Sequence, residues 1–168
     1  MAKPKRIKAF FNKPKKQIDL KKEEKESECY LDTLSFKLNN NIKPPYSVIL
    51  DTNFINHSIK KKIDIKKGML DCLVSNVKLF VTDCVIAELE KLGRPYRVAL
   101  ALVKGDGFIS LDCDHKGTYA DDCIVNRISA MRCYIVATCD TELKNRIRKV
   151  GGVPIISVLN RKYDLEGK

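Results

Sequence analysis

Hydrophobic positions after residue 45 fall into short apolar runs that alternate with segments of helical spacing. Four runs rich in β-branched residues predict buried strands: YSVILD (46–51), KLFVT (78–82), CYIVATCD (133–140) and VPIISVL (153–159). Apolar residues three and four apart predict helices over 63–74, 83–93, 94–104, 121–131 and 141–150. Because strands and helices alternate with short links, the pattern predicts an α/β fold whose parallel sheet is covered by helices on both faces.

The first 44 residues have a different pattern. Residues 1–28 are dominated by Lys and Glu and contain too few apolar residues to fold alone, so we expect a flexible arm. Apolar residues over 29–41 predict a short helix, which Pro44 and Pro45 then end. A chain of 168 residues suits one domain, and we expect a basic amino-terminal arm (1–44), a folded domain (45–163) and a carboxy-terminal tail (164–168).

The charge of the chain is concentrated at its two ends. The formal net charge is +11, and the excess lies in residues 1–16 and 141–168, while residues 17–140 sum to zero. Basic arms suit a polyanion such as nucleic acid, because each Lys or Arg that neutralises a phosphate also releases a counterion. For residues 1–16 alone, a targeting signal or a role in solubility explains the charge equally well.

Seven cysteines are scattered along the chain, and the sequence has no signal peptide and no apolar run long enough to cross a bilayer. This combination predicts a reducing compartment, no disulfides and no membrane partner. Most of the thiols are expected to be small buried hydrophobes, and Cys72, Cys133 and Cys139 are assigned to the core.

Acidic residues stand where the predicted strands meet the helices. Asp51 and Asp140 end two strands, Glu88 lies on the helix after the second strand, and Asp121 with Asp122 opens the helix before CYIVATCD. Ligands of open parallel sheets sit at the carboxyl ends of the strands, so these acids could face one crevice. Clustered carboxylates repel unless a cation neutralises them, and Mg²⁺ or Mn²⁺ prefers such oxygen ligands. One or two such ions could activate a water and stabilise the charge that develops in phosphodiester hydrolysis.

Each acid also has a local explanation. Asp51, Asp121, Asp122 and Asp140 could cap the helices that follow them, and Glu88 could be a solvated residue near Lys91. Taken singly, the local role is the better explanation for each residue. Taken together, acids from separate segments favour a shared site.

Four segments, in this order, closely resemble the PIN-domain family: VILDTNFI, TDCVIAELEKLG, HKGTYADDCIV and CYIVATCDTELKNRIRK. More narrowly they resemble the PIN nucleases of the eukaryotic small-subunit processome. The resemblance covers residues 45–163 and implies a three-layer α/β/α fold with a central five-stranded parallel sheet. It also implies that Mg²⁺ or Mn²⁺ supports endonucleolytic RNA cleavage and that four acids bind the metal: Asp51, Glu88, Asp121 and Asp140. Asp122 is expected to support the site from behind these ligands or to cap its helix.

The resemblance further implies a substrate, partners and a location. The substrate would be the precursor of small-subunit rRNA, the partners RNA and assembly proteins of the processome, and the location the nucleus and nucleolus. A catalytically silent PIN-fold assembly factor of the same particle is the main alternative, which the complete acid set disfavours. A toxin-like PIN ribonuclease acting on free RNA is a second, which the basic arm disfavours.

Basic residues follow Asp140 on one predicted helix, where an RNA backbone near the acids would need positive charge. These candidates are Lys144, Arg146, Arg148 and Lys149, with Arg161 and Lys162 extending the surface. Without the acids, a solvated basic face would be the simpler explanation. Lys91 and Arg97 are weaker candidates, Thr52 and Asn53 are placed to orient the first loop or contact phosphate, and His57 is given no role.

A second metal is suggested by Cys84, Cys113, His115 and Cys123, since three Cys and one His form a structural zinc set. Their spacing is not that of a standard finger, so buried thiols and a surface histidine explain the spacing better. The resemblance brings the zinc explanation closer to the simpler one, because the processome relatives include a member with a Cys/His zinc site in this part of the chain, and one structural zinc ion is retained as a prediction. One conflict is expected: Cys84 and Glu88 are four apart and share a helix face, so they should not serve different metals unless Cys84 precedes the first turn.

Overall fold

The computed structural model describes residues 39, 41–113, 115 and 119–166. The arm expected over 1–28 and nearly all of the helix expected over 29–41 lie outside the described residues. The helices that the structure does describe are too short or too polar to span a lipid bilayer.

A six-stranded sheet forms the centre of the molecule, in the order β3-β2-β1-β4-β5-β6. Its strands are β1 (Tyr46–Leu50), β2 (Val77–Thr82), β3 (Phe108–Leu111), β4 (Tyr134–Ala137), β5 (Ile155–Leu159) and β6 (Lys162–Glu166). The first five are parallel, and β6 pairs antiparallel with β5. All four residues of β4 are buried, as expected for a strand near the middle of a parallel sheet with helices on both faces.

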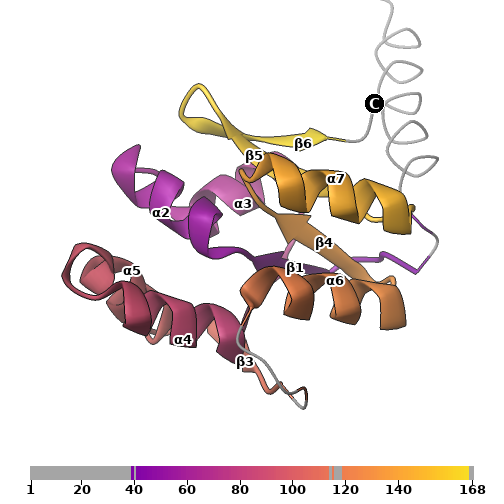
Figure 1. Cartoon of the computed structure of the whole chain (residues 1–168). Coiled ribbons are helices and arrows are strands. Elements are labelled where there is room, and N and C mark those ends of the chain that lie inside the picture. Colours follow the sequence, from indigo (N-terminus) through magenta and orange to yellow (C-terminus); the bar gives the residue numbers. More distant parts are fainter. Residues whose placement is uncertain (1–38, 40, 114, 116–118, 167–168) are drawn as a thin grey trace, which may run out of the picture.

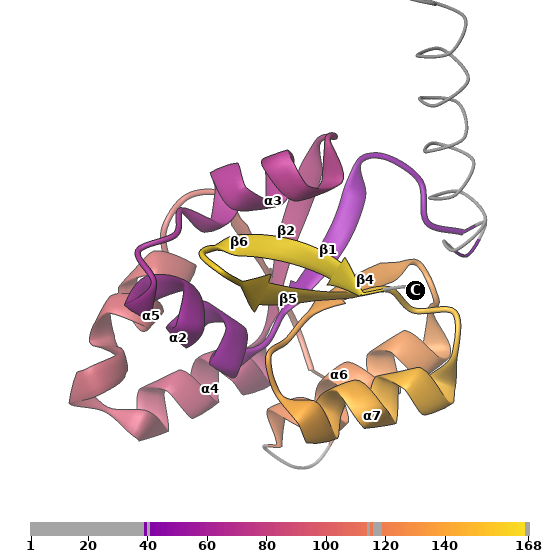
Figure 2. The same cartoon turned by 90° about the horizontal axis from the view of Figure 1, so that it is seen from above.

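Helices cover both faces of this sheet, which confirms the predicted α/β/α layers (Figures 1 and 2). In the described part of the chain they are α2 (Thr52–Lys60), α3 (Ile65–Leu73), α4 (Asp83–Leu92), α5 (Arg97–Val103), α6 (Ala120–Ala130) and α7 (Thr141–Val150), with a 3₁₀ turn η1 (Arg94–Tyr96). Helix α3 packs against β2 and β6, whereas α6 lies beside both α4 and α7. Figure 2 shows α4, α6 and α7 together on the side of the sheet away from α3.

Two strands lie outside the predicted runs. Strand β3 is a short edge strand with partly exposed residues, and β6 alternates inward Tyr163 and Leu165 with exposed Lys162 and Asp164. The five parallel strands implied by the resemblance are present, and β6 is added at their edge. The domain boundary expected at Tyr163 therefore falls inside β6, which carries the sheet on to Glu166.

Tyr163 fixes α3 against β6 through a close approach to Gly68. The buried ring lies 4.8 Å from the ring of Phe54, and its hydroxyl donates to Ser58 Oγ at 2.8 Å. A Cβ at position 68 would lie 2.7 Å from Tyr163 Cε2, closer than carbon atoms pack. The lack of a side chain at Gly68 thus lets α3 lie directly on the tyrosine ring.

Gly68→Ala is expected to destabilise the domain by roughly 1 kcal/mol, because the clash with the fixed ring outweighs the gain of about 1 kcal/mol that alanine brings within a helix. The measurement is urea unfolding of the parent, both single variants and the double variant with Tyr163→Leu. Without the ring the same change should become stabilising. An equal cost in both backgrounds would show that the ring is not the obstacle.

Candidate functional site

Asp51 lies at the carboxyl end of β1 and is almost completely buried, with 1% of its surface exposed. Its carboxylate accepts a hydrogen bond of 2.8 Å from Thr138 Oγ1, at the end of the neighbouring strand β4. Although Asp51 occupies the N-cap position of α2, its side chain makes no capping bond. Helix capping therefore does not explain this buried charge.

Glu88 is half-buried on α4 and accepts a hydrogen bond of 3.0 Å from Thr52 Oγ1. Thr52 is the first residue of α2, directly after Asp51. This bond joins two helices at the edge of the sheet and turns Glu88 toward Asp51. Glu88 is accordingly not the freely solvated residue of the local explanation.

Asp121 and Asp140 bring charge to the same place from α6 and from the end of β4. Burial raises the pKa of Asp121, and the charges of Asp140 and Glu88 raise it further against the opposing effect of Arg146. Burial likewise raises the pKa of Asp51 to about 7, with the charges of Asp121 and Glu88 adding to the shift and the bond from Thr138 opposing it. Asp51, Glu88 and Asp121 therefore lie near enough at the carboxyl edge of the sheet for their charges to act on one another, and Asp140 lies near enough to act on Asp121.

Asp140 also has the capping role that the local explanation gives it. One carboxylate oxygen accepts from the Glu142 amide at 3.1 Å at the start of α7, and the Asp140 amide donates to Thr138 Oγ1 at 3.0 Å. The other carboxylate oxygen has no protein hydrogen-bond partner within the described residues. Asp140 can therefore cap the helix and still offer an oxygen to the cluster.

Asp122 does not cap α6. The helix begins at Ala120, no side chain caps it, and both aspartates lie inside its first turn. Asp122 is exposed and pairs with Arg146 of α7. Capping by Asp121 or Asp122 is thus a wrong expectation, and Asp122 instead holds Arg146, whose charge acts on Asp121.

The donor set of the acidic cluster fits a hard divalent cation. Every donor is a carboxylate oxygen, and an acid whose pKa is raised by burial and by neighbouring acids is the kind of group that a cation restores to its charged form. The carboxylates are spread more widely than the thiols described below, since the Cys/His set alone among the described residues gathers three or more ligand atoms tightly. An acidic set of this kind suits Mg²⁺ or Mn²⁺ held partly through water.

Thr138 is the residue of this site that the sequence did not single out. Its buried hydroxyl donates to Asp51 and accepts from the Asp140 amide, so one side chain links two of the acids. The available signal was its place between the apolar run of β4 and Asp140 in ATCD. A polar β-branched residue ending a buried strand needs hydrogen-bond partners.

Without divalent cation, the stability of the domain should depend on pH through Asp51. The folded state keeps a proton on Asp51 up to a pH of about 7, whereas the unfolded chain loses it near 3.9, so deprotonation favours unfolding as pH rises between these values. Relative to Asp51→Asn, which cannot ionise, the parent should lose about 2–3 kcal/mol of unfolding free energy between pH 5 and pH 8. Urea unfolding of both proteins across this range measures the difference. Parallel curves would show that Asp51 is ionised throughout.

The four predicted zinc ligands come together in the structure. The ligand atoms of Cys84, Cys113, His115 and Cys123 all lie within 4.8 Å of one another. Cys113 Sγ is 3.3 Å from Cys123 Sγ, and Cys84 Sγ is 3.4 Å from His115 Nε2. A tetrahedral zinc ion with bonds of about 2.0–2.3 Å would place its ligands roughly 3.3–3.8 Å apart. The two short pairs fit this spacing, and pairs at the 4.8 Å limit would need to close by about 1 Å.

Electrostatics within this Cys/His cluster prepare one thiol to lose its proton. Burial raises the pKa of Cys84 to about 12 and also raises that of Cys123. At Cys113 burial acts in the same direction, but hydrogen bonds involving the Cys84 backbone and the neighbouring thiols outweigh it and lower the pKa. A cation would be needed to deprotonate the other two thiols.

The expected conflict between Cys84 and Glu88 is wrong. Cys84 lies in the first turn of α4, yet its sulfur joins the Cys/His cluster while the carboxylate of Glu88 bonds Thr52. One helical turn separates their Cβ atoms by about 5–6 Å, and the longer Glu side chain can extend away from the thiol. One helix can therefore serve both groups.

The basic candidates divide into two sets. On α7, Lys144 and Arg148 both pair with Glu166 of β6, Arg146 pairs with Asp122, and Lys149 is exposed. Arg161 lies in the turn from β5 to β6 and Lys162 begins β6, away from this row. Lys91 and Arg97 are exposed, and His57 is an exposed helix residue as expected. Cys72, Cys133 and Cys139 are partly buried and pack against the core.

Known proteins share this sequence and fold. A family model described as Fcf1 matches residues 71–167. The rRNA-processing protein FCF1 of Saccharomyces cerevisiae is 56% identical over 133 residues, which are 79% of this chain and 70% of that protein. The rRNA-processing protein FCF1 homolog of Homo sapiens is 51% identical over 143 residues, or 85% of this chain and 72% of that protein.

A solved structure described as the PIN domain endonuclease Utp24 has 53% sequence identity and a TM-score of 0.73. The match covers 75% of this chain and 95% of that one. The resemblance to PIN-domain proteins of rRNA processing is thereby confirmed. The chain belongs to the Fcf1 family of PIN-domain proteins.

Proposed function

We propose that this protein acts in rRNA processing as a metal-dependent endoribonuclease that cleaves the precursor of small-subunit rRNA. The observation that carries the proposal is the buried carboxylate of Asp51, which lies near Glu88 of α4 and Asp121 of α6, with Asp140 near Asp121 in turn. Relatives named as rRNA-processing proteins and the similar PIN domain endonuclease support the assignment.

Asp51, Glu88, Asp121 and Asp140 would hold Mg²⁺ or Mn²⁺, directly or through water. When bound, such an ion activates a water and stabilises the charge that develops on a phosphodiester during hydrolysis. The protein supplies the orientation: Thr138 fixes Asp51 and the backbone of Asp140, and Thr52 fixes Glu88. Arg146, which pairs with Asp122 and acts on Asp121, would contact the phosphate backbone.

The Cys/His cluster would hold one structural Zn²⁺. Its role would be to tie α4 and α6 together, since Cys84 and Cys123 stand on these helices and Glu88 and Asp121 stand on them as well. Zinc would thus position two of the four acids without taking part in cleavage.

The wider setting follows from the family. The partners would be pre-rRNA, other RNA of the small-subunit processome and its assembly proteins, and the place of action the nucleus and nucleolus. Residues 45–163 would form the nuclease domain together with the remainder of β6, and residues 1–44 a basic arm that contacts the particle.

Adjacent aspartates provide a matched test of this function. Asp121→Asn should abolish Mn²⁺-dependent cleavage of a single-stranded RNA spanning the start of mature small-subunit rRNA, because it removes a proposed metal ligand. Asp122→Asn removes the same charge one residue away and should retain activity within about tenfold of the parent, since it breaks only the ion pair with Arg146.

If Asp121→Asn cuts as well as both Asp122→Asn and the parent, the acids of the cluster are not the active site. If the parent itself does not cut under any divalent cation, alone or with processome extract, the proposal fails. The protein would then be an RNA-binding assembly factor that has the PIN fold.

A further inference from the structure

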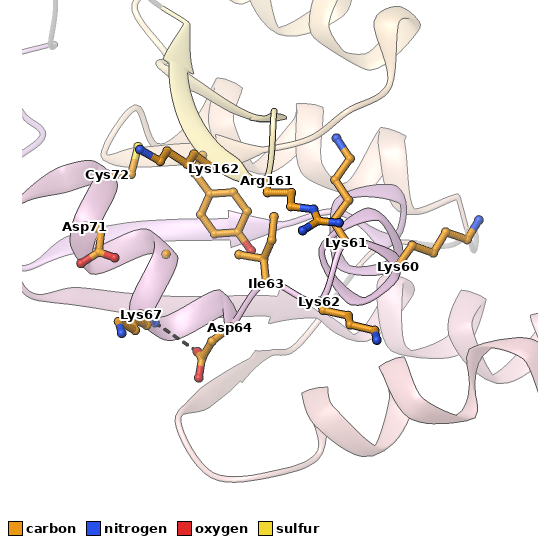
Figure 3. A pocket seen from close by; sticks show the side chains of 12 residues that line it. Lys60, Lys61, Lys62, Ile63, Asp64, Lys67, Asp71, Cys72, Arg161 and Lys162 are labelled. Atoms are coloured by element: carbon orange, nitrogen blue, oxygen red, sulfur yellow. Dashed lines mark hydrogen bonds between the residues drawn. The ribbon is translucent and has the colours of Figure 1, made fainter.

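A hollow of about 770 Å³ lies apart from both clusters, where the end of α2, the start of α3 and the turn from β5 to β6 meet. Six basic side chains line it: Lys60, Lys61, Lys62, Lys67, Arg161 and Lys162. Figure 3 shows Lys60, Lys61 and Lys62 on one side of this basic hollow and Lys162 on the other, with Arg161 between them. The lining thus draws cations from segments about 100 residues apart in the sequence.

These charges are not neutralised within the described part of the protein. Asp64 and Asp71 are the two acids of the lining, and Asp64 is engaged as the cap of α3, where it accepts from the Lys67 amide at 3.1 Å. The four ion pairs found within the described residues all involve other basic side chains. Lys61 makes a long contact of 3.5 Å to the Val158 carbonyl. The hollow therefore presents an excess of positive charge to solvent.

Two of these cations occupy backbone positions that favour glycine. Lys62 has a φ of 55° just beyond the end of α2, and Arg161 has a φ of 63° in the two-residue turn that joins β5 to β6. Turns of this kind prefer Asn-Gly, and this one reads Asn160-Arg161. Lys62 and Arg161 thus have a left-handed backbone conformation that costs less for glycine, at two places around one hollow. This cost favours a function for the two charged side chains.

The floor of the hollow is rigid. Tyr163 lines it, and its ring is held by Phe54, by the hydroxyl of Ser58 and by the close approach of Gly68. Arg161 and Lys162 directly precede this held residue in the chain, so their backbone has a fixed place beside α2 and α3, which favours binding of an anion.

Helix α2 connects the basic hollow with the acidic cluster. It begins at Thr52, beside Asp51, and ends at Lys60 in the hollow, and its nine residues span about 13 Å. Asn53, His57 and Lys60 are exposed at positions that share one face of the helix. A polar strip thus runs along α2 from one site to the other, over a distance that a few nucleotides cover.

We propose that the basic hollow is a second RNA site, which binds the phosphate backbone of the strand a few nucleotides away from the bond at the acidic cluster. The inference rests on the proposed function only in taking RNA as the ligand. If the acidic cluster cleaves a phosphodiester, then the polyanion that would follow the polar strip of α2 to the basic hollow is the RNA substrate. Contacts of this kind position the strand and carry no sequence preference.

The test measures the affinity of the full chain for a fluorescein-labelled 30-nucleotide single-stranded RNA by anisotropy, with Ca²⁺ in place of Mg²⁺ and Mn²⁺. Lys62→Gly combined with Arg161→Gly removes two charges and introduces the residue that each backbone position favours, so the fold should be kept. The matched control is Lys78→Gln combined with Arg132→Gln. It removes two exposed charges near the amino ends of β2 and β4, at the edge of the sheet opposite to the acidic cluster. Lys62→Asn with Arg161→Asn repeats the loss of charge with a second residue that tolerates this backbone.

We expect both hollow variants to bind RNA about tenfold more weakly at 150 mM salt and to lower the salt slope by about 1.4, at about 0.7 for each phosphate that is no longer neutralised. The control should change affinity by less than about threefold and leave the slope unaltered. Equal effects of the hollow and control variants would overturn the proposal. So would hollow variants that keep RNA affinity but no longer bind fluorescein-labelled polyglutamate, because the site would then serve an acidic protein segment.

Single-turnover cleavage of the 30-nucleotide RNA in Mn²⁺ separates this inference from the proposed nuclease. The hollow variants should need about tenfold more protein to reach half of the maximal cleavage rate, because they lose contacts to the RNA backbone, whereas Asp121→Asn should lose the maximal rate itself. A parent that binds through the hollow but never cuts would refute the nuclease and leave the second site standing.

Discussion

Asp51→Asn is expected to lower Mn²⁺-dependent RNA cleavage at least about 100-fold while leaving the domain folded. The substitution removes the charge of the most buried acid in the cluster and keeps an oxygen that can accept from Thr138. A loss of this size is typical when a group that stabilises developing charge or orients its counter-ion is removed. Single-turnover cleavage with saturating protein measures the chemical step, and circular dichroism checks the fold.

The control for this prediction is Asp106→Asn, at an exposed position in the turn before β3, which should cut like the parent. A second readout is the stabilisation by Mn²⁺, which Asp51→Asn should lose and Asp106→Asn should keep. If Asp51→Asn cuts at the parental rate, its carboxylate has no part in catalysis, and the raised pKa reflects burial alone.

The second large effect is expected from the Cys/His cluster. Cys113→Ser should abolish binding of one equivalent of zinc and destabilise the domain by at least about 3 kcal/mol, because the free energy of binding a structural zinc ion adds directly to folding. The metal content of the purified full chain and its urea unfolding measure the two effects. Cys133→Ser is the matched control, since this partly buried thiol lies outside the cluster.

Loss of zinc should also weaken metal binding at the acidic cluster. Cys84 and Glu88 share α4, and Cys123 follows Asp121 on α6, so loosening these helices should weaken Mn²⁺ binding together with zinc binding. A parent chain that purifies without zinc, or a Cys113→Ser protein as stable as Cys133→Ser, would show that the four residues are buried thiols beside a surface histidine.

Apolar runs were enough to predict the centre of the sheet but not its edges. Strands β1, β2, β4 and β5 contain buried residues and are rich in β-branched ones, so their sequences carry a strong signal. None of the four residues of β3 is buried, and β6 places charged Lys162 and Asp164 beside Tyr163. Edge strands have only one neighbour and need not be apolar, and for that reason their sequences resemble loops.

Acids of the candidate site that follow strands were predictable from the sequence, because chain order and sheet topology together determine where the ends of the strands lie. Asp51 and Asp140 end strands, and a parallel sheet brings such positions to one edge. Side-chain partners were not predictable in this way. The bonds from Thr138 to Asp51 and from Thr52 to Glu88 depend on the twist and register of the assembled sheet, which spacing along the chain does not contain.

The net charge of long segments gave no indication of the basic hollow. Residues 17–140 sum to zero, yet they contain the run from Lys60 to Lys62 and Lys67. The fold adds Arg161 and Lys162 to this run by bringing the turn after β5 to the end of α2. A window of about ten residues would have revealed SIKKKIDIKK, but its partner segment required the structure.

Mn²⁺ binding by the zinc-loaded full chain is the most direct test, because a nuclease and a silent PIN-fold assembly factor differ in this property before any substrate or partner is added. Isothermal titration of the parent should give saturable binding at the acidic cluster, and Asp51→Asn and Asp121→Asn should each lose it while retaining zinc. If the parent binds no Mn²⁺, or if both variants bind as the parent does, the acids do not form a metal site and the nuclease proposal is contradicted.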